Sequence, residues 1–280
     1  MLLSASERKF ISQGIQQNLR SDGRRRMDHR FFDLKTAVIL NANGSARLVL
    51  DHTDVLVAVK VEISEPSHSS PSVGRFECSV KCAPSASLHF EGRGADVLNV
   101  QLTSGLSALV SDAIDLGALC IVPRQQCWVV CVDAIVLDSS GNLGDALSMA
   151  TYAALQTTTL ASIKVVSGDE SNETVIEVSD DPYETTKLPL KNNVPIQVTL
   201  TKIGGCFVVD ATAEEESCMS CRVSFCISSG GKICSMNKIG IGGISHSVLL
   251  DMMKLASVTG KDLIKKLQPN TQPNTKQSTH

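Results

Sequence analysis

The sequence predicts an α/β fold, mixed α+β in character, built from two halves that each combine strands with a helix. The run CWVVCVDAIVLD at 127–138 is apolar on both faces, which is typical of a strand buried between layers. A helix with an alanine-rich apolar stripe is expected next, at 141–156. A second block of strand-like runs precedes another helical pattern at 244–267. Hydrophobic residues form 42% of the 280 residues, which is enough for a sizeable core.

The first half contains the earlier elements. Apolar residues at helical spacing predict a helix at 4–19, and Asn142 is placed to cap the helix at 141–156. Alternating apolar residues predict strands, with a tight turn from Asp51 to Asp54 and a loop rich in Pro and Ser at 65–74. In chain order we expect strands at 46–50, 55–63 and 75–82, then a helix at 95–114.

The second half follows a polar segment, 167–193, whose turn signals predict a connector. Strands are expected at 196–200, 206–210, 222–228 and 232–236. The polar tail at 268–280 is expected to be disordered. The predicted organisation is therefore an N-terminal helix and arginine-rich arm (1–28), a first half (29–166), the connector, a second half (194–267) and the tail.

Composition excludes several classes of protein. The net charge is −3, so any binding of nucleic acid is expected to be local or shared with partners. No run approaches the roughly 20 apolar residues of a membrane span, and no secretory signal is recognisable. The ten cysteines lie mostly in strand-like runs and are expected to be reduced thiols, as in the cytosol or nucleus. Cys218 and Cys221 form one CxxC without a second pair, so we favour packed helical cysteines over zinc and expect no metal or cofactor.

Five arginines stand between Arg20 and Arg30. Asp22 and Asp28 are interleaved with them, which favours ion pairs inside or between subunits over a bare basic surface. We interpret the segment as structural, and keep its surplus arginines as candidate contacts to a neighbouring chain or to nucleic acid: Arg24, Arg25 and Arg26.

Several motifs, in order, resemble the RNase PH family. They are LRSDGRRRMDHR, GSARLVLDHTDVLVAVKVEI, FEGRG, IVPRQQCWVVCVDAIVLDSSGN, DALSMATYAAL and VVDATAEEE, and together they extend over about residues 8–255. The resemblance implies an RNase PH-like fold, with mixed sheets packed against helices. It also implies a six-membered ring around a pore, as in the RNA exosome, in the nucleus, nucleolus and cytoplasm. The implied partners are other RNase PH-like ring subunits, RNA-binding cap subunits, RNA and associated exoribonucleases.

The same resemblance addresses catalysis. Active family members bind phosphate at a helix start that carries Ser or Thr and Arg, whereas this chain has Asn142, Gly144 and Asp145 there. We expect Asp145 to repel phosphate and to cover the helix N-terminus itself. The sequence therefore favours a non-catalytic ring subunit that supports 3′-to-5′ RNA processing and degradation. The alternative is a phosphate-dependent 3′-to-5′ exoribonuclease.

An acidic run, DATAEEE, lies where active members carry D-L-x-Y-x-E-D. It comprises Asp210, Glu214, Glu215 and Glu216, and Ala213 replaces the tyrosine. Our main interpretation is a solvated helix start; a metal site and a vestigial site that touches a neighbour or an ion remain the alternatives.

Two further arginines are candidate RNA contacts. Arg93 lies between two glycines, and its alternative role is a surface charge beside a turn. Arg124 is either an RNA contact or part of a structural ion pair. In the related archaeal ring, the inactive subunit lends arginines from its long helix to its neighbour. Residues 95–123 of this chain contain no Lys or Arg, so that role is not expected here.

Overall fold

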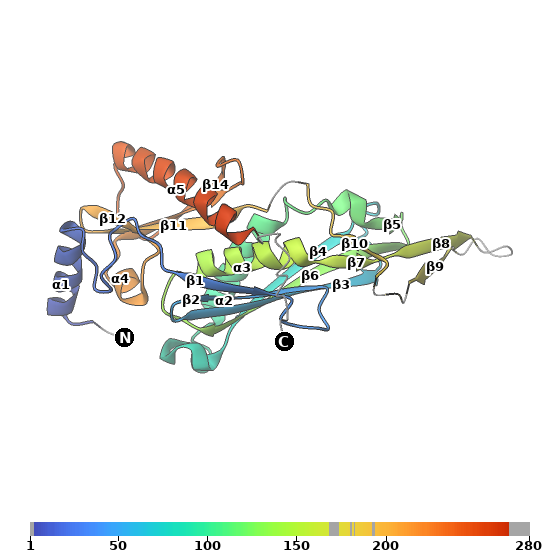
Figure 1. The fold of residues 1–280 in the computed structure, drawn as a ribbon, viewed down its shortest axis with the longest axis horizontal. Coiled ribbons are helices and arrows are strands. Elements are labelled where there is room, and N and C mark those ends of the chain that lie inside the picture. The colour runs from blue at the N-terminus through green and yellow to red at the C-terminus, as the bar shows by residue number, and fades with distance from the viewer. Residues whose placement is uncertain (1–2, 168–173, 180, 182, 192–193, 269–280) are drawn as a thin grey trace, which may run out of the picture.

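The computed structural model describes residues 3–167, 174–179, 181, 183–191 and 194–268. The molecule is elongated, with two main sheets and the helix α3 (Leu143–Thr157) between them (Figure 1). Among the described residues, no helix combines the length and the apolar character needed to cross a bilayer.

The first sheet is mixed, as expected from the resemblance. Its strand order is β1-β2-β3-β6-β4, and β5 also pairs with β6. All pairs are antiparallel except β4 with β6. The bounds are β1 Phe32–Thr36, β2 Gly44–Leu50, β3 Thr53–Ser64, β4 Arg75–Cys82, β5 Cys120–Val122 and β6 Gln126–Asp138. Alternate residues of β3, from Val55 to Val59, are fully buried because successive side chains point to opposite faces.

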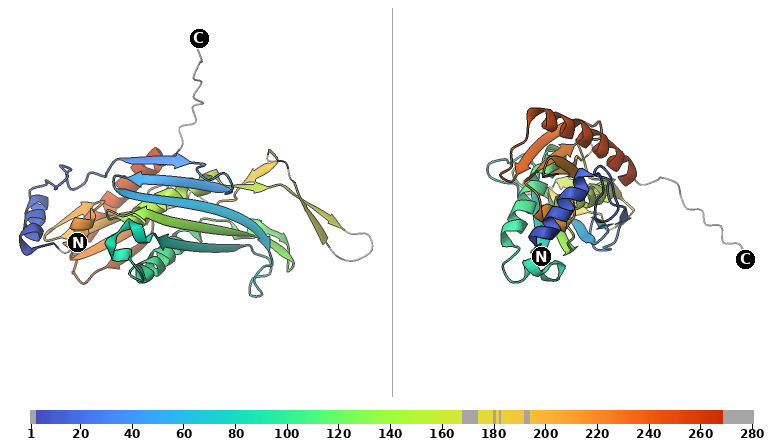
Figure 2. Two further views of the ribbon diagram at one scale, coloured as in Figure 1. Left: turned by 90° about the horizontal axis from the view of Figure 1, so that it is seen from below. Right: turned by 90° about the vertical axis from the view of Figure 1, so that its left-hand side faces the viewer.

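The second sheet is antiparallel, with the order β12-β11-β13-β14. Its strands are β11 Ile196–Ile203, β12 Cys206–Val209, β13 Cys221–Ile227 and β14 Ile233–Ile239. Two small ladders lie between the two main sheets in chain order: β7 (Thr159–Ala161) pairs with β10 (Thr185–Lys187), and β8 (Ile163–Ser167) pairs with β9 (Thr174–Val178). The β8–β9 ladder projects from one end of the molecule, and α1 lies at the other end (Figure 2).

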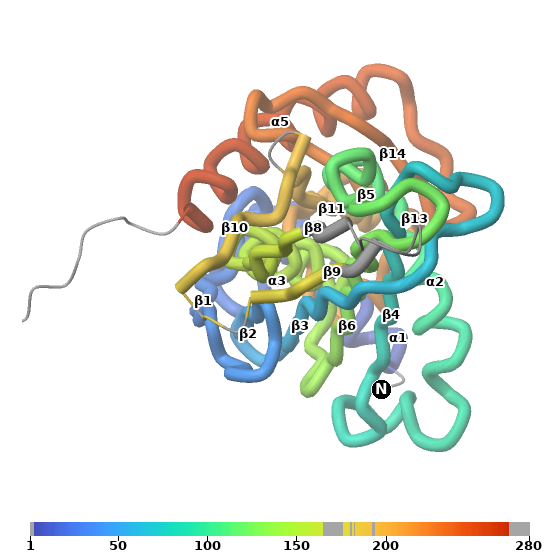
Figure 3. Tube along the Cα trace, turned by 90° about the vertical axis from the view of Figure 1, so that its right-hand side faces the viewer, coloured from blue at the N-terminus to red at the C-terminus, as the bar shows by residue number. Residues whose placement is uncertain are grey.

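Helix α3 is the centre of the packing. It contacts β2, β3 and β11, and its small residues allow a close approach to β2: a Cβ at Gly44 would lie 2.6 Å from the Ala154 carbonyl oxygen. Helix α5 (His246–Leu267) covers the second sheet, and α2 (Asp96–Val110) packs on β4 (Figure 3). Helix α1 (Ala5–Gln16) packs on β12, and α4 (Ala213–Ser217) is a single capped turn. Short 3₁₀ turns occur at Pro84–Ala86, Leu88–Phe90 and Leu116–Leu119.

The structure corrects four details of the sequence analysis. The polar connector carries strands β9 and β10. The outer part of β6 is not buried on both faces, because Ile135 and Leu137 are partly exposed. Asn142 does not cap α3 through its side chain, and its backbone is left-handed, with φ 57°. Cys221 begins strand β13, so the CxxC is not helical. The expected disorder of the tail concerns residues 269–280, which lie outside the described part.

Candidate functional site

A cleft of about 1280 Å³ opens between α2, the start of α3, α4 and the strands β13 and β14. Hydroxyl and amide side chains supply much of its polar surface, among them Ser139, Ser140, Ser148, Gln197, Ser224 and Asn237. Within this lining the one Lys or Arg is Arg222, and its guanidinium lies 3.4 Å from a carboxylate oxygen of Glu216. The cleft therefore offers little positive charge to a phosphate.

Beside this cleft, Asp210 follows β12 at a left-handed position with φ 49° and is fully buried. Its carboxylate accepts hydrogen bonds from the Arg30 backbone N–H, Nε and Nη2 at 2.8 to 2.9 Å. It also accepts from Arg24 Nη1 at 3.0 Å and from Asn142 Nδ2 at 2.7 Å. Burial raises the pKa of Asp210, but the bonds and charge of Arg30 more than offset this and hold the pKa well below its ordinary value. Both oxygens of Asp210 are thus fully engaged within the chain.

Glu215 is also buried, and it forms a second ion pair, with Arg20. Its carboxylate accepts from Arg20 Nε at 2.8 Å and from Arg20 Nη2 at 2.5 Å, in a two-pronged contact. It also accepts from the Thr212 backbone N–H at 2.9 Å, which completes a capping box on α4. Arg20 further donates to the carbonyl oxygens of Val209 and Asp210, at 3.0 and 2.8 Å.

We call these five residues the arginine–carboxylate cluster: Arg20, Arg24, Arg30, Asp210 and Glu215. The arginines come from the N-terminal arm and the edge of the first half, and the carboxylates come from the second half. Near the cluster, the backbone of Val209 donates to the Arg26 carbonyl oxygen at 2.9 Å, and Ala213 donates to Ser140 at 3.0 Å. The cluster therefore joins the two halves of the fold.

The first turn of α3 is covered from the second half. The Asn142 backbone N–H donates to Glu216 Oε1 at 3.0 Å, so the carboxylate at the helix start is that of Glu216. Burial raises the pKa of Glu216, and the charge of Arg222 opposes that rise. A Cβ at Gly144 would lie 2.3 Å from Gln197 Nε2, which shows that the Gln197 amide sits against this turn.

Asp145 does not cover the helix N-terminus as the sequence analysis expected. Its carboxylate turns toward β11 and accepts from the Thr199 N–H at 2.7 Å, from Thr199 Oγ1 at 2.6 Å and from Gln197 Nε2 at 3.2 Å. Asp145 is 1% exposed, and burial raises its pKa to about 6. It is a link between α3 and the second sheet.

The interpretation of the acidic run as a solvated helix start is wrong for two of its members, because Asp210 and Glu215 are buried. Glu214 is exposed and Glu216 is partly buried, and both line the cleft. Among the described residues, no group of three or more His, Cys, Asp and Glu side chains is arranged to hold a metal.

The candidate RNA-contact arginines are not brought together. Arg24 is bound to Asp22 and Asp210, and Arg26 bonds to Asn18. Arg93 is 94% exposed and pairs with Asp96. The side chains of Arg25 and Arg124 are exposed and make no ion pair within the described part of the chain. For Arg124, the structural ion pair is therefore not observed.

Sequence reasoning missed the residues that complete the site. Arg20, Arg30 and Thr199 were not singled out, although Arg20 opens the R-x-D-G-R motif. Arg20 and Glu215 are 195 positions apart, and Arg30 and Asp210 are 180 apart, so no local spacing reveals these pairs.

Comparison with known proteins identifies the class. Two family patterns match the chain: the 3′ exoribonuclease (RNase PH) family, domain 1, at residues 28–161, and domain 2 at residues 193–259. The chain therefore belongs to the RNase PH family.

Individual relatives carry more particular names. A chain from Dictyostelium discoideum, named as an exosome complex exonuclease RRP42, is 39% identical over 94% of this chain and 95% of its own length. The exosome complex component Rrp42 of Methanocella arvoryzae is 32% identical over 95% of this chain and 97% of its own. A chain of the Archaeoglobus fulgidus exosome, solved with RNA bound to the active site, matches with a TM-score of 0.81 and 25% identity, over 94% and 98% of the two chains.

Proposed function

We propose that this protein is a non-catalytic subunit of an RNA exosome core ring. In this role it supports 3′-to-5′ RNA processing and degradation by building the ring and lining its RNA path. Relatives named as exosome components, similar over nearly their full length, support the assembly. The observation that carries the lack of catalysis is the state of Asp210, whose carboxylate already accepts five hydrogen bonds.

Phosphorolysis needs a bound phosphate and a carboxylate that is free to hold a metal or move a proton. At the start of α3, Glu216 and Gln197 occupy the space beside the first turn, and Ser, Thr and Arg are absent from residues 142–147. Negative charge at this position opposes phosphate binding. The remaining acids of the cleft, Glu214 and Glu216, have no Lys or Arg facing them except the paired Arg222.

The test is phosphate-dependent degradation of poly(A) by the purified chain, with and without Mg²⁺. We expect no nucleoside diphosphate above background. The matched control is a Glu214→Gln, Glu216→Gln double variant, which removes the cleft carboxylates. Product formed by the wild type and lost in this variant would establish the alternative, a phosphate-dependent exoribonuclease. Product that is unchanged in the variant would identify a contaminating enzyme.

The proposed partners are other RNase PH-like ring subunits, RNA-binding cap subunits, RNA and associated exoribonucleases, and the proposed locations are the nucleus, nucleolus and cytoplasm. A ring neighbour that covers exposed apolar side chains would remove apolar surface from water, which favours assembly. Examples are Phe31, Leu40, Leu88, Val97 and Ile241. Native mass spectrometry of the endogenous complex tests the partner set, and imaging of the tagged protein tests its location.

A further inference from the structure

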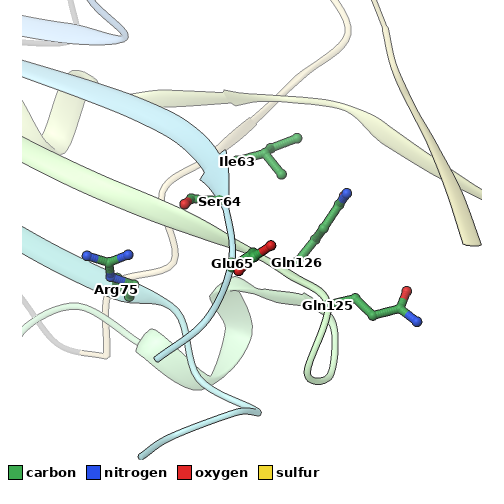
Figure 4. A pocket seen from close by; sticks show the side chains of 6 residues that line it. All are labelled: Ile63, Ser64, Glu65, Arg75, Gln125 and Gln126. Atoms are coloured by element: carbon green, nitrogen blue, oxygen red, sulfur yellow. The ribbon is translucent and has the colours of Figure 1, made fainter. Parts of the chain in front are cut away.

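A separate cavity of about 460 Å³ lies at one end of the first sheet, where β3 ends, β4 begins and a turn joins β5 to β6. Its lining residues are Ile63, Ser64, Glu65, Arg75, Gln125 and Gln126 (Figure 4). None of them belongs to the arginine–carboxylate cluster or lines the large cleft. The volume suits a single nucleotide-sized ligand.

Backbone hydrogen bonds hold the segments around this cavity together. The Arg124 N–H donates to the Pro71 carbonyl oxygen at 2.8 Å, which ties the β5–β6 turn to the loop after β3. The Gly74 N–H donates to the Leu116 carbonyl oxygen, also at 2.8 Å. Arg124 has φ 68°, a left-handed conformation that costs a residue with a Cβ some strain. This turn sets Gln125 and Gln126 on the cavity.

The polar side chains of the cavity have unused hydrogen-bonding capacity. Within the described part of the chain, Glu65, Gln125 and Gln126 make no side-chain hydrogen bond, and Arg75 spends one nitrogen, Nη2, on Glu77. Figure 4 shows Arg75 set apart from Glu65, Gln125 and Gln126, and since Arg75 is in register with Val129, its side chain lies on the opposite face of the sheet from that of Gln126. The part of the cavity around Glu65 thus combines an acceptor-only carboxylate with two amides that both donate and accept.

From this set of groups we infer that the cavity binds a guanine base of single-stranded RNA. Arg75 is already paired with Glu77 at 2.6 Å, so the uncompensated charge of the lining is the Glu65 carboxylate, which opposes a free phosphate and suits the N–H donors of a neutral ring. Guanine presents adjacent N1–H and N2–H donors, which match the Glu65 carboxylate, and an O6 acceptor, which matches the amide N–H groups of Gln125 and Gln126. Adenine places the lone pair of N1 where guanine has a donor, and this opposes a carboxylate.

Arg124 supplies the second part of the site. It stands next to Gln125 on the turn, its side chain is exposed, and it makes no ion pair within the described residues. A base held in the cavity places its sugar–phosphate backbone at the rim, where this guanidinium neutralises one phosphate. The site rests on the proposed role in an RNA-degrading ring and adds a base preference to it.

The experiment measures binding of fluorescently labelled UUGUU, UUAUU and UUUUU to the full chain, alone and in the assembled ring. UUGUU should bind at least about fivefold more tightly than UUAUU. Glu65→Gln should abolish or reverse this preference, because an amide can also pair with adenine. Glu62→Gln is the matched control, since Glu62 lies near the end of β3, three residues before Glu65, but does not line the cavity, and it should leave the preference unchanged.

Arg124→Gly tests the phosphate contact, because glycine accepts the left-handed turn without strain. It should weaken binding of all three oligonucleotides alike and lower the slope of log affinity against log salt by about 0.7. An unchanged slope would overturn the phosphate contact. Equal binding of the three oligonucleotides, or a guanine preference that survives Glu65→Gln, would overturn the base site. The proposed function is tested separately, by native mass spectrometry of the ring and by the phosphorolysis assay, so a chain that enters the ring without phosphorolysis but shows no guanine preference would overturn the base site alone.

Discussion

Arg30 and Asp210 form a buried two-pronged ion pair, with Nη2–Oδ1 at 2.8 Å and Nε–Oδ2 at 2.9 Å, although they are 180 positions apart in the chain. The pair joins the start of the first half to the end of β12 in the second half. Since an isolated buried charge is costly, each residue depends on the other for its place in the interior.

Arg30→Ala should lower the free energy of unfolding by about 3–5 kcal/mol, because it leaves the Asp210 carboxylate buried without its main partner. Urea unfolding of the purified chain measures this. Arg93→Ala is the control, since that arginine is 94% exposed and its pair with Asp96 should contribute less than about 1 kcal/mol. Equal effects of the two substitutions would contradict a structural role for the cluster.

Arg20 and Glu215 should be energetically coupled. In a double-mutant cycle with Arg20→Met and Glu215→Gln, the second substitution should cost less once the first is present, with a coupling of at least about 1 kcal/mol. The reason is that each single change leaves one buried polar partner unsatisfied. The cycle is read from unfolding midpoints and slopes in urea. Additive costs would mean that the 2.5 Å contact does not act as a pair.

Asp145→Asn should change how stability depends on pH. The pKa of Asp145 is raised to about 6 by burial, so the native state holds this proton more tightly than the unfolded chain does. The contribution of the wild-type residue is therefore most favourable below about pH 4 and is lost as pH rises toward 6 and above.

Because an asparagine can accept from the Thr199 N–H and donate to its hydroxyl, the variant should keep the link to β11 without this loss. The stability of Asp145→Asn relative to wild type should rise by up to about 3 kcal/mol between pH 4 and 7. Thermal unfolding across this range measures the difference. A constant difference would show that Asp145 titrates normally.

The contribution of Asp210 to stability should change with pH in the opposite direction to that of Asp145. Its pKa is lowered in the folded state, so its contribution is present above about pH 4 and is lost on further acidification. An Arg30→Ala, Asp210→Ala double variant should lose less stability than wild type between pH 4 and 2. Acid titration followed by circular dichroism compares the two proteins. Parallel acid curves would contradict the ion pair as a source of acid sensitivity.

Gly141→Ala should destabilise the junction between the halves by more than about 3 kcal/mol. Gly141 has φ 90°, and a Cβ there would lie 2.5 Å from the Ala213 backbone nitrogen, which cannot move aside alone. Gly105→Ala is the matched control. Gly105 lies within α2, no atom approaches its Cβ position within 4 Å, and alanine should stabilise the helix by up to about 1 kcal/mol. Unfolding midpoints that shift in the same direction would contradict this contrast.

The secondary structure was predictable where buried residues recur at a regular spacing in the sequence. The alternation of β3 and the apolar stripe of α3 follow directly from their two-sided contacts. Strand β1 (Phe32–Thr36) was missed because it lies at the sheet edge with mostly exposed side chains, so it has little apolar pattern. Strands β9 and β10 were missed because polar residues surround them.

The candidate site was less predictable because the burial and charge state of its carboxylates depend on arginines that are distant in the sequence. The residues of the DATAEEE run are compatible both with a solvated helix start and with a buried cluster, so the run alone does not distinguish the two structures. The difference lies in Arg20 and Arg30, which are brought to Glu215 and Asp210 only by the folded arm. Likewise, Asp145 stands in the first turn of a helix, where it is expected to face the helix end, but β11 offers it the Thr199 N–H and hydroxyl instead.

The shared use of Asp210 by Arg30, Arg24 and Asn142 limits how this protein can change over evolutionary time. Introducing a phosphate-binding helix start by substitutions at 142–147 would leave the Asp210 carboxylate bound by the same three residues and would not free it for chemistry. A carboxylate released for chemistry would leave the buried Arg30 without its counter-charge and would leave Arg24 with Asp22 alone. If Asp210 were to act in catalysis, the N-terminal arm would first need a new anchor before the old one could be given up, so no single substitution would suffice.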